Sequence, residues 1–206
     1  MVRPYVIAVT GGAGAGKTTT ARFFAERGAV VLDADVFGHV VLGDPAVVEQ
    51  LVAEFGLGVL GDAGVVDRPA LAAAAFTSSE TVARLDAITH PPIAEALLAA
   101  LDALGAANEP VEYAVIDVPL LAAVPSVLDR CDSVVAVEAP EAERISRLAA
   151  RGIDEVDARR RIALQPSDEE RRALATDVVV NDGAPADLEP HLERVWGRIA
   201  ARAAIR

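Results

Sequence analysis

The chain has very few residues of several kinds, and each shortage excludes a class of protein. It has one cysteine, Cys131, in 206 residues, which excludes an internal disulfide framework and is typical of a reducing compartment. Its apolar runs are far shorter than the roughly 18 residues of a membrane-spanning helix. The run at 6–9 is also too short for a signal peptide. We therefore expect a cytoplasmic protein that is not inserted in a membrane.

Positive charge is scarce relative to negative charge. The formal net charge is −12, which argues against nonspecific binding to nucleic acid because such binding depends on a basic surface. The three histidines are scattered, and no Cys/His cluster has the spacing of zinc ligands. Cys131 begins the stretch CDSVVAVE, which is typical of a buried strand and favours an inert core position over a reactive thiol.

Lysine is rarer still, and its position is informative. Lys17 is the single lysine among 19 basic residues. It lies in GGAGAGKT, from Gly11 to Thr18, which fits the phosphate-loop pattern G-x-x-x-x-G-K-[ST]. Small residues let the backbone turn its N–H groups toward phosphate oxygens, and the N-terminus of the following helix favours an anion. Lys17 then supplies charge to the outer phosphates, and Thr18 offers a hydroxyl to Mg²⁺.

Two other interpretations of this glycine-rich stretch are weaker. A turn that binds nothing does not explain why the single lysine stands there. A dinucleotide-binding turn also precedes an acidic residue by about 20 positions, as this one precedes Asp33 and Asp35. That turn requires G-x-G-x-x-G, however, and the glycines at 11, 12, 14 and 16 do not give this spacing.

Strand and helix signals alternate along most of the chain, which predicts an α/β fold. Five strands are predicted by the apolar runs at 6–10, 29–32, 113–117, 133–138 and 177–180. Helices are predicted at 18–26, 141–150, 154–164, 168–175 and 188–199. Continuous apolar strands between helices are typical of a parallel sheet covered on both faces. Residues 36–108 interrupt the alternation with helices alone, at 45–55, 68–76, 79–90 and 93–104. We expect Pro91 and Pro92 to end the third of these.

Carboxylates follow two of the predicted strands. Asp33 and Asp35 end the run VVLDAD, and they point to opposite sides if the strand continues, so that one of them faces the phosphates. Either also suits the cap of a helix beginning near residue 36. Asp117 ends the third strand, where a carboxylate supports Mg²⁺ through a water molecule.

The segment 141–172 is rich in arginine but close to neutral, with eight arginines and eight acids. Arg144, Arg147 and Arg151 are spaced to share one helix face. Most of the arginines suit ordinary surface ion pairs, such as Glu143 with Arg147. The functional alternative is a mobile lid that brings one to three arginines over the transferring phosphoryl group.

Taken in order, these motifs resemble the dephospho-CoA kinase family over nearly the whole chain. The motifs are TGGAGAGKTT at 10–19, VVLDAD at 30–35, FG at 55–56, DR at 67–68 followed by LAAAAF, HP at 90–91, VIDVPLL at 115–121, RLAAR at 147–151, R-I-x-x-Q at 161–165 and DVVVNDG at 177–183. The resemblance implies a P-loop NTPase fold: a five-stranded parallel sheet flanked by helices, with a helical substrate-binding insertion and a helical lid.

The resemblance further implies phosphorylation of the ribose 3′-hydroxyl of dephospho-CoA by ATP and Mg²⁺. Asp35 is then the base for that hydroxyl, and Lys17 and Arg147 complete the catalytic set. The implied ATP-binding residues are Gly11, Gly12, Ala13, Gly14, Ala15, Gly16, Lys17, Thr18, Thr19, Arg147, Asn181 and Gly183. The implied acceptor-binding residues are Asp35, Arg68, His90 and Arg151, and the implied metal-binding residues are Thr18 and, through water, Asp117.

The same resemblance implies three parts of the chain. They are a nucleotide-binding core at 1–35, 109–140 and 176–206, a CoA-substrate-binding insertion at 36–108, and an Arg-rich lid at 141–175. Considered without the resemblance, His90 equally suits a core histidine, and Trp196 suits packing. We expect ATP and dephospho-CoA as partners, with neither nucleic acid nor membrane, in a monomer or small homo-oligomer.

The chain departs from the family pattern at a few positions. Ala123 stands where relatives usually have Glu after PLL, Thr176 precedes Asp177 where many have Asp, and Arg144 stands where many have Gln. A kinase for a nucleoside monophosphate, gluconate or shikimate is the nearest alternative, although the long insertion suits a bulky acceptor. An alternative from another class is a nucleotide-dependent switch or regulator with no acceptor. GTP-selective switches usually carry an N-K-x-D motif, which this chain does not have because its single lysine is in the phosphate loop.

Overall fold

The computed structural model describes residues 3–119, 121–183 and 185–206. Leu120, in the PLL motif, lies outside the described residues. The chain divides into two compact units: Met1–Asp33 with Leu101–Arg206, and Ala34–Ala100. Each unit has its own architecture and is described by itself.

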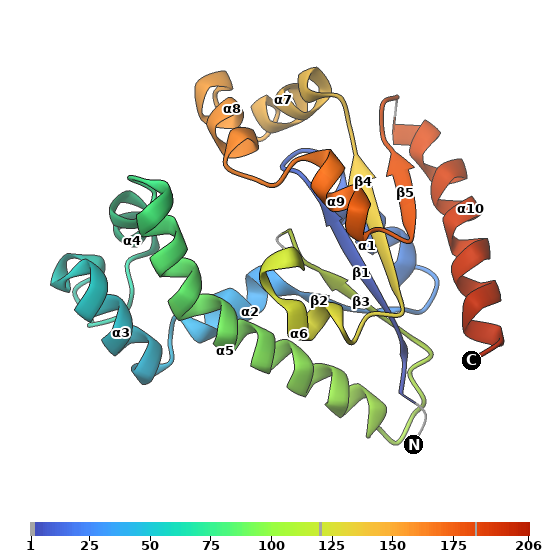
Figure 1. Cartoon of the computed structure of the whole chain (residues 1–206), viewed down its shortest axis with the longest axis horizontal. Helices are drawn as coiled ribbons and strands as arrows, with labels where there is room; N and C mark the ends of the chain where they lie inside the picture. Colours follow the sequence, from blue (N-terminus) through green and yellow to red (C-terminus); the bar gives the residue numbers. More distant parts are fainter. Residues whose placement is uncertain (1–2, 120, 184) are drawn as a thin grey trace. The chain divides into compact units, whose positions relative to one another are not determined.

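The first unit is built on a sheet of five parallel strands (Figure 1). They are β1 (Tyr5–Gly11), β2 (Val30–Asp33), β3 (Tyr113–Asp117), β4 (Ser133–Glu138) and β5 (Asp177–Val180), in the order β2-β3-β1-β4-β5. Every residue of the central strand β1 is buried, as a parallel strand between two helical layers requires. The predicted five-stranded parallel sheet is confirmed.

Helices of the first unit follow the strands along the chain. They are α1 (Lys17–Ala25), α6 (Pro125–Leu128), α7 (Glu141–Ala149), α8 (Glu155–Ala163), α9 (Asp168–Leu174) and α10 (Pro185–Ala204), with a 3₁₀ turn at η2 (Leu121–Ala123). The side chain of Asp154 caps α8, and Ser167 and Glu170 form a capping box at α9. Helix α10 is longer than the predicted 188–199, because its alanine-rich end carries little periodic signal.

One face of this sheet is covered by α1 and α10. Phe24 and Ile199 are fully buried there against Ile7 and Val135. Trp196 of α10 packs against the same cluster, with its ring centroid 4.6 Å from that of Tyr113. Trp196 therefore has the packing role that the sequence predicted.

The second unit is helical. It contains α2 (Ala34–Val41), α3 (Pro45–Phe55), the 3₁₀ turn η1 (Leu57–Val59), α4 (Arg68–Ala75) and α5 (Ser79–Gly105), whose residues from Leu101 onward belong to the first unit. Asp44 and Asp67 cap α3 and α4 by accepting hydrogen bonds from backbone N–H groups. The core of the unit consists of Val41, Val47, Leu51, Val59, Val66 and Leu71.

The helix break predicted at Pro91 and Pro92 is wrong, because α5 runs without interruption from Ser79 to Gly105. A proline ring fixes φ near −65°, which a helix accepts, and the cost of about 3 kcal/mol comes from the missing N–H donor and a clash with a carbonyl. Apolar side chains on both sides of the pair, Ile88 and Ile93, pack on the core of the second unit. That packing offsets the local cost.

Within the described ranges, no single helix is long and apolar enough to cross a membrane. Helices α2 and α3 meet that length and composition only when taken together, as a pair bent by 81°.

Candidate active site

The glycine-rich stretch forms the turn between β1 and α1. Strand β1 ends at Gly11 and α1 begins at Lys17. Gly14 and Gly16 have φ angles of 76° and 115°, which glycine adopts without strain. The Lys17 ammonium lies against the loop, where Nζ donates to the carbonyl of Gly11 at 3.0 Å. Thr18, in the first turn of α1, is exposed.

Two loop glycines lie very close to side chains from other parts of the chain. A Cβ atom on Gly12 would lie 2.1 Å from Nη2 of Arg144, and one on Gly16 would lie 2.5 Å from Nδ2 of Asn181. Both distances are far below van der Waals contact. The loop is therefore packed directly against these two side chains.

Ala13 is held from both sides by the segment 141–175, which we call the Arg-rich segment. Nε of Arg144, on α7, donates to the Ala13 carbonyl at 2.9 Å. Oε1 of Gln165, just after α8, accepts from the Ala13 N–H at 2.7 Å. Arg144 is 6% exposed, and its Nη1 lies 3.9 Å from Asp168. The peptide groups on the two sides of Ala13 are thus fixed by side chains 131 and 152 residues away.

The next two carbonyls of the loop are also occupied. Arg147 donates to the carbonyl of Gly14 at 3.4 Å and to that of Asn181 at 3.1 Å. Nδ2 of Asn181, just after β5, donates to the carbonyl of Ala15 at 2.8 Å. The N–H groups of Ala13 and Ala15 are bonded to Gln165 and to the Gly12 carbonyl. The other N–H groups of the turn, at Gly14 and Gly16, belong to peptide groups whose carbonyls are held in this way, and fixed N–H groups of this kind suit an anion.

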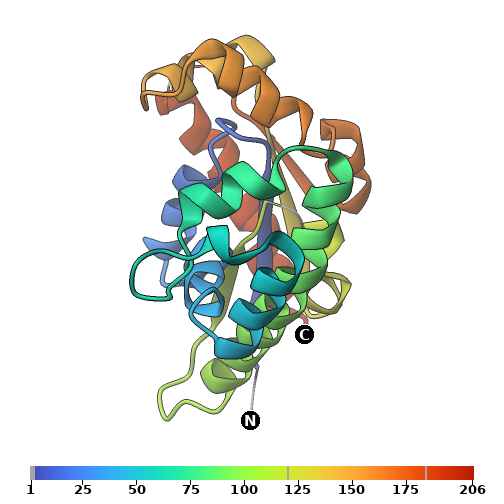
Figure 2. The same cartoon turned by 90° about the vertical axis from the view of Figure 1, so that its left-hand side faces the viewer.

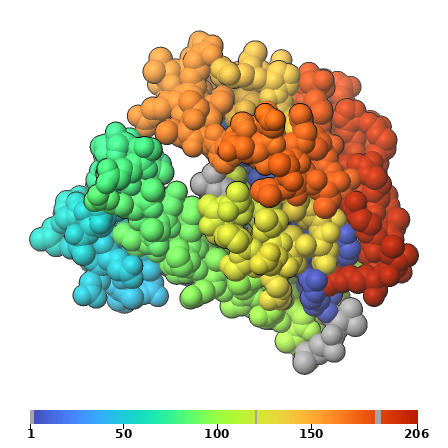
Figure 3. Space-filling view, viewed as in Figure 1, coloured from blue at the N-terminus to red at the C-terminus, as the bar shows by residue number. Residues whose placement is uncertain are grey.

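The Arg-rich segment covers the loop. In Figure 2, α7 and α8 lie directly above the turn that follows β1. In the space-filling view of Figure 3, taken from the same side as Figure 1, the orange atoms of this segment lie over the upper part of the first unit, where β1 ends. The loop is therefore enclosed on that side by α7–α9.

Two carboxylates stand side by side at the carboxyl edge of the sheet. Asp33 and Asp117 are the last residues of β2 and β3, and they are paired in register. Val9, near the end of β1, pairs with Asp117 on the other side. The position of Asp117 follows the sequence prediction, while its pairing with Asp33 was not predicted.

Asp35 lies in the second unit, in the first turn of α2, and is exposed. The strand does not continue through it, because β2 ends at Asp33 and α2 begins at Ala34 rather than near residue 36. Arg68 is the first residue of α4 and is exposed. His90 lies within α5, with Nε2 3.3 Å from Oδ1 of Asp86. Burial raises the pKa of Asp86, and the charge of His90 partly offsets this.

Two other predicted residues lie in the first unit. Arg151 is exposed in the turn after α7, so it does not share a helix face with Arg144 and Arg147 as predicted, because α7 ends at Ala149. Gly183 follows β5 two residues after Asn181, and a Cβ there would lie 2.5 Å from Oδ2 of Asp187.

Cys131 lies in the turn before β4 and is only partly buried, so its predicted place in a core strand is wrong. Strand β4 begins two residues later, where the apolar run starts. The thiol donates to the Val127 carbonyl at 3.1 Å. Burial, reinforced by Asp132, raises the pKa of the thiol to about 12. The predicted lack of reactivity therefore has a physical basis.

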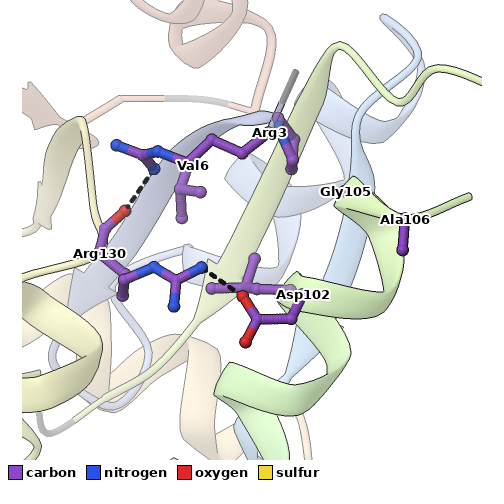
Figure 4. A pocket seen from close by; sticks show the side chains of 8 residues that line it. Arg3, Val6, Asp102, Gly105, Ala106 and Arg130 are labelled. Carbon is purple, nitrogen blue, oxygen red and sulfur yellow. Dashed lines mark hydrogen bonds and ion pairs between the residues drawn. The ribbon is translucent and has the colours of Figure 1, made fainter. Parts of the chain in front are cut away.

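A pocket of about 230 Å³ lies at the other end of the strands, where β1 begins (Figure 4). Arg3, Asp102 and Arg130 line it, and Arg130 donates to Asp102 at 2.6 Å. Its position before β1 separates it from the phosphate loop, which follows β1. Its charged groups are paired, Arg130 with Asp102 and Arg3 with Asp132, so it is no candidate for the reaction site.

Sequence reasoning assigned no role to two residues that contact the loop. Arg144 was placed on one helix face with Arg147 and noted as a departure from the family pattern, but it was not assigned to the site. Gln165 belongs to the R-I-x-x-Q motif, but no local pattern indicates that its side chain reaches Ala13. The contact depends on how α8 and α9 pack.

A phosphate loop between a central parallel strand and its helix, enclosed by arginines, defines a P-loop kinase-type nucleotide site. The family model described as dephospho-CoA kinase matches residues 5–187. The chain therefore belongs to the dephospho-CoA kinase family. The relatives that carry that name include one from Corynebacterium efficiens, 42% identical (95% of this chain, 98% of the relative), and one from Thermobifida fusca, 37% identical (95% and 96%).

Solved structures share the fold of this chain. A protein from Thermus thermophilus has a TM-score of 0.76 at 31% identity and covers 96% of this chain and 98% of its own. Dephospho-CoA kinase from Campylobacter jejuni has a TM-score of 0.61 at 23% identity, with 95% and 97% covered. A shikimate kinase from Acinetobacter baumannii has a TM-score of 0.56 at 17% identity, with 96% and 94% covered. The last two show the shared fold alone.

Proposed function

We propose that this chain transfers the γ-phosphoryl group of ATP to the ribose 3′-hydroxyl of dephospho-CoA, giving CoA and ADP. The observation that carries the proposal is the phosphate loop, whose carbonyls at Ala13, Gly14 and Ala15 are held by Arg144, Arg147 and Asn181. This loop stands in a chain that belongs to the dephospho-CoA kinase family along nearly its full length.

The phosphate loop contributes to the reaction by electrostatic stabilisation of the phosphates. The phosphate-loop residues, 11–19, bind the ATP phosphates through backbone N–H groups and the N-terminus of α1. Lys17 and Arg147 carry the positive charges that stabilise the transferring group, and Asn181 and Gly183 lie toward the adenine. Since the transition state of phosphoryl transfer is loose, positioning and charge contribute most of the rate.

The site suits Mg²⁺. Thr18 offers an exposed hydroxyl, and the carboxylates of Asp33 and Asp117 are adjacent in register. The described residues contain no group of three or more His, Cys, Asp or Glu side chains that would hold a metal by themselves. Mg²⁺ takes one or two protein oxygens together with phosphates and water, and hydroxyl and carboxylate oxygens are ligands of that kind. Thr18, with Asp117 through water, would hold the ion, which neutralises phosphate charge when bound.

On the acceptor side, Asp35 is the proposed base. It takes the proton of the 3′-hydroxyl as the oxygen bonds to the γ-phosphorus and the bond to the leaving ADP oxygen breaks. Arg68, His90 and Arg151 are proposed to bind dephospho-CoA. The segment 36–108 is then the acceptor-binding part, and 141–175 is the lid over the core formed by the rest.

We also propose a cytoplasmic monomer or small homo-oligomer that works without nucleic acid or membrane. The net charge of −12 supports the absence of nonspecific nucleic-acid binding, and a single cysteine suits a reducing compartment.

The test is ATP turnover with and without dephospho-CoA, with the product identified by mass. ADP release that depends on dephospho-CoA, and a product heavier by one phosphate, is the expected result. ATP binding without such turnover would overturn the proposed acceptor. A screen of other alcohols, including gluconate and shikimate, would then identify the acceptor.

A further inference from the structure

Gln165 contacts the phosphate loop through one defined atom. A backbone N–H donates and never accepts, so the hydrogen bond from Ala13 requires the side-chain oxygen of Gln165 to face the loop. This contact fixes the orientation of the carboxamide. The NH₂ group of Gln165 therefore lies on the other side of the carboxamide, with two donors in a fixed direction.

The backbone around Gln165 is fixed at both ends. Before it, α8 begins at Glu155 with Asp154 as its cap. After it, Ser167 and Glu170 form the capping box of α9, and Nε of Arg172 donates to the buried carboxylate of Glu138 at 2.9 Å. Strand β4 ends at Glu138, so this pair attaches α9 to the sheet. The position of Gln165 beside the loop is therefore set by the fold and not by its own hydrogen bond alone.

The surroundings of this contact are positively charged. Arg144 holds the other side of Ala13, and Arg171, itself 3% exposed, shares Asp168 with it at 3.2 Å. Nε and Nη2 of Arg171 are buried and have no hydrogen-bond partner among the described residues. Burial lowers the pKa of Arg171, and repulsion from Arg144 adds to this effect. The carboxylates of Asp168 and Glu170 oppose that lowering. The buried guanidinium of Arg144, which contacts the loop directly, is the cation that favours an anion nearby.

We propose that Gln165 is a positioning residue for the outer phosphates of ATP. Its carbonyl oxygen is anchored on the Ala13 N–H, and its NH₂ group donates to a phosphate oxygen. A neutral amide suits this place, because it can accept from the loop and donate to an anion at the same time. A carboxylate of the same shape accepts from the loop but repels the phosphates.

The variant Gln165→Glu distinguishes donation to a phosphate oxygen from a role limited to holding the Ala13 N–H. The carboxylate keeps an acceptor for the Ala13 N–H, and the nearby guanidinium of Arg144 allows it to be ionised without loss of the fold. If the NH₂ group donates to phosphate, nucleotide affinity falls because one hydrogen bond to a charged group is lost and a negative charge is added. We expect a loss of about 10- to 100-fold for ATP, a smaller loss for ADP and little change for adenosine.

Two further variants complete the experiment. Gln165→Leu removes both contacts and is expected to weaken ATP binding, but by less than Gln165→Glu. Leu164→Glu adds the same charge at the neighbouring residue, which is 56% exposed, and is expected to change ATP affinity by no more than about twofold because exposed charges are screened. Thermal unfolding of each variant reports whether the fold is retained.

Nucleotide affinity is measured by calorimetry without any acceptor. A Gln165→Glu protein that binds ATP like the wild type would overturn the proposal, whatever Gln165→Leu does. Equal losses for ATP, ADP and adenosine would also overturn it, since they indicate a structural role. The inference rests on the proposed use of ATP. It is separable from the proposed acceptor, because turnover on dephospho-CoA is measured independently with the wild-type enzyme.

Discussion

At the scale of single residues, the phosphate loop depends on the side chains around it as much as on its own glycines. Its carbonyls at Ala13 and Ala15 are held by Arg144 and Asn181, which are distant in sequence. A peptide group held in this way keeps its N–H direction fixed before an anion arrives, so binding orders fewer groups. Substitutions at these residues are therefore expected to affect nucleotide binding first.

Gly14 offers a test of how tightly the loop is enclosed. Its φ is 76°, and a Cβ atom would lie 2.6 Å from the carbonyl oxygen of Arg144. Gly28 has a φ of 90°, and a Cβ atom there would have no neighbour within 4 Å. We expect Gly14→Ala to weaken ATP binding at least about 10-fold, since backbone atoms must move apart.

The matched control is Gly28→Ala, which carries the same backbone strain of about 1–2 kcal/mol but no clash. It should lower the unfolding temperature and leave ATP affinity unchanged in calorimetry. Equal ATP affinities for the two variants would show that the loop is not closely packed against α7.

Asp35 carries the proposed proton transfer, so its substitution tests the acceptor half of the reaction. Asp35→Asn keeps the size of the side chain and removes its basicity. We expect kcat to fall by about 10²- to 10⁴-fold, with ATP affinity retained because Asp35 is not part of the loop. Steady-state kinetics and ATP calorimetry give the two values.

Asp62 is an exposed acid in the loop after η1, and Asp62→Asn is expected to behave like the wild type. If Asp35→Asn turned over at the wild-type rate, Asp35 would have no role as the base.

At the scale of elements, the long helix α5 shows packing overriding a local signal. Pro91 and Pro92 stand inside it, each without the N–H that the helix would use. We expect Pro91→Ala to raise the free energy of unfolding by about 2 kcal/mol. Restoring the helix geometry adds about 3 kcal/mol to the free energy of unfolding. Alanine also gives the unfolded chain more conformational freedom, which takes back up to about 1 kcal/mol. Urea unfolding measures the change.

Pro45 is the matched control, because it stands at the start of α3 where no N–H donor is needed. Pro45→Ala should leave stability unchanged or lower it slightly. A loss of stability in Pro91→Ala as well would mean that the helix does not use the restored donor.

At the scale of the whole molecule, one carboxylate connects the two ends of the chain. Asp132, 14% exposed at its side chain, accepts from Arg3 at 2.9 Å and from Arg206 at 2.9 Å, and its Oδ2 accepts from the N–H of Val6 at 2.8 Å. We expect Asp132→Ala to lower the free energy of unfolding by about 1–3 kcal/mol, since the partners are partly solvated. Activity per folded molecule should remain, because the site is at the other end of β1.

Asp129 is exposed nearby, and Asp129→Ala is the control for removing a charge alone. Urea unfolding of both variants, with turnover measured alongside, makes the comparison. Equal stabilities would show that the ends of the chain are not held by Asp132.

The strands, the phosphate loop and the family could be predicted from the amino-acid sequence, because each has a local pattern. An apolar run such as 133–138 predicts its own strand, and the pattern from Gly11 to Thr18 predicts its own turn. Packing was needed to show that α5 passes through its prolines, that Asp33 stands beside Asp117, and that Arg144 and Gln165 hold Ala13. These features depend on contacts between residues far apart in the chain, whose energies appear only when the helices and strands pack together.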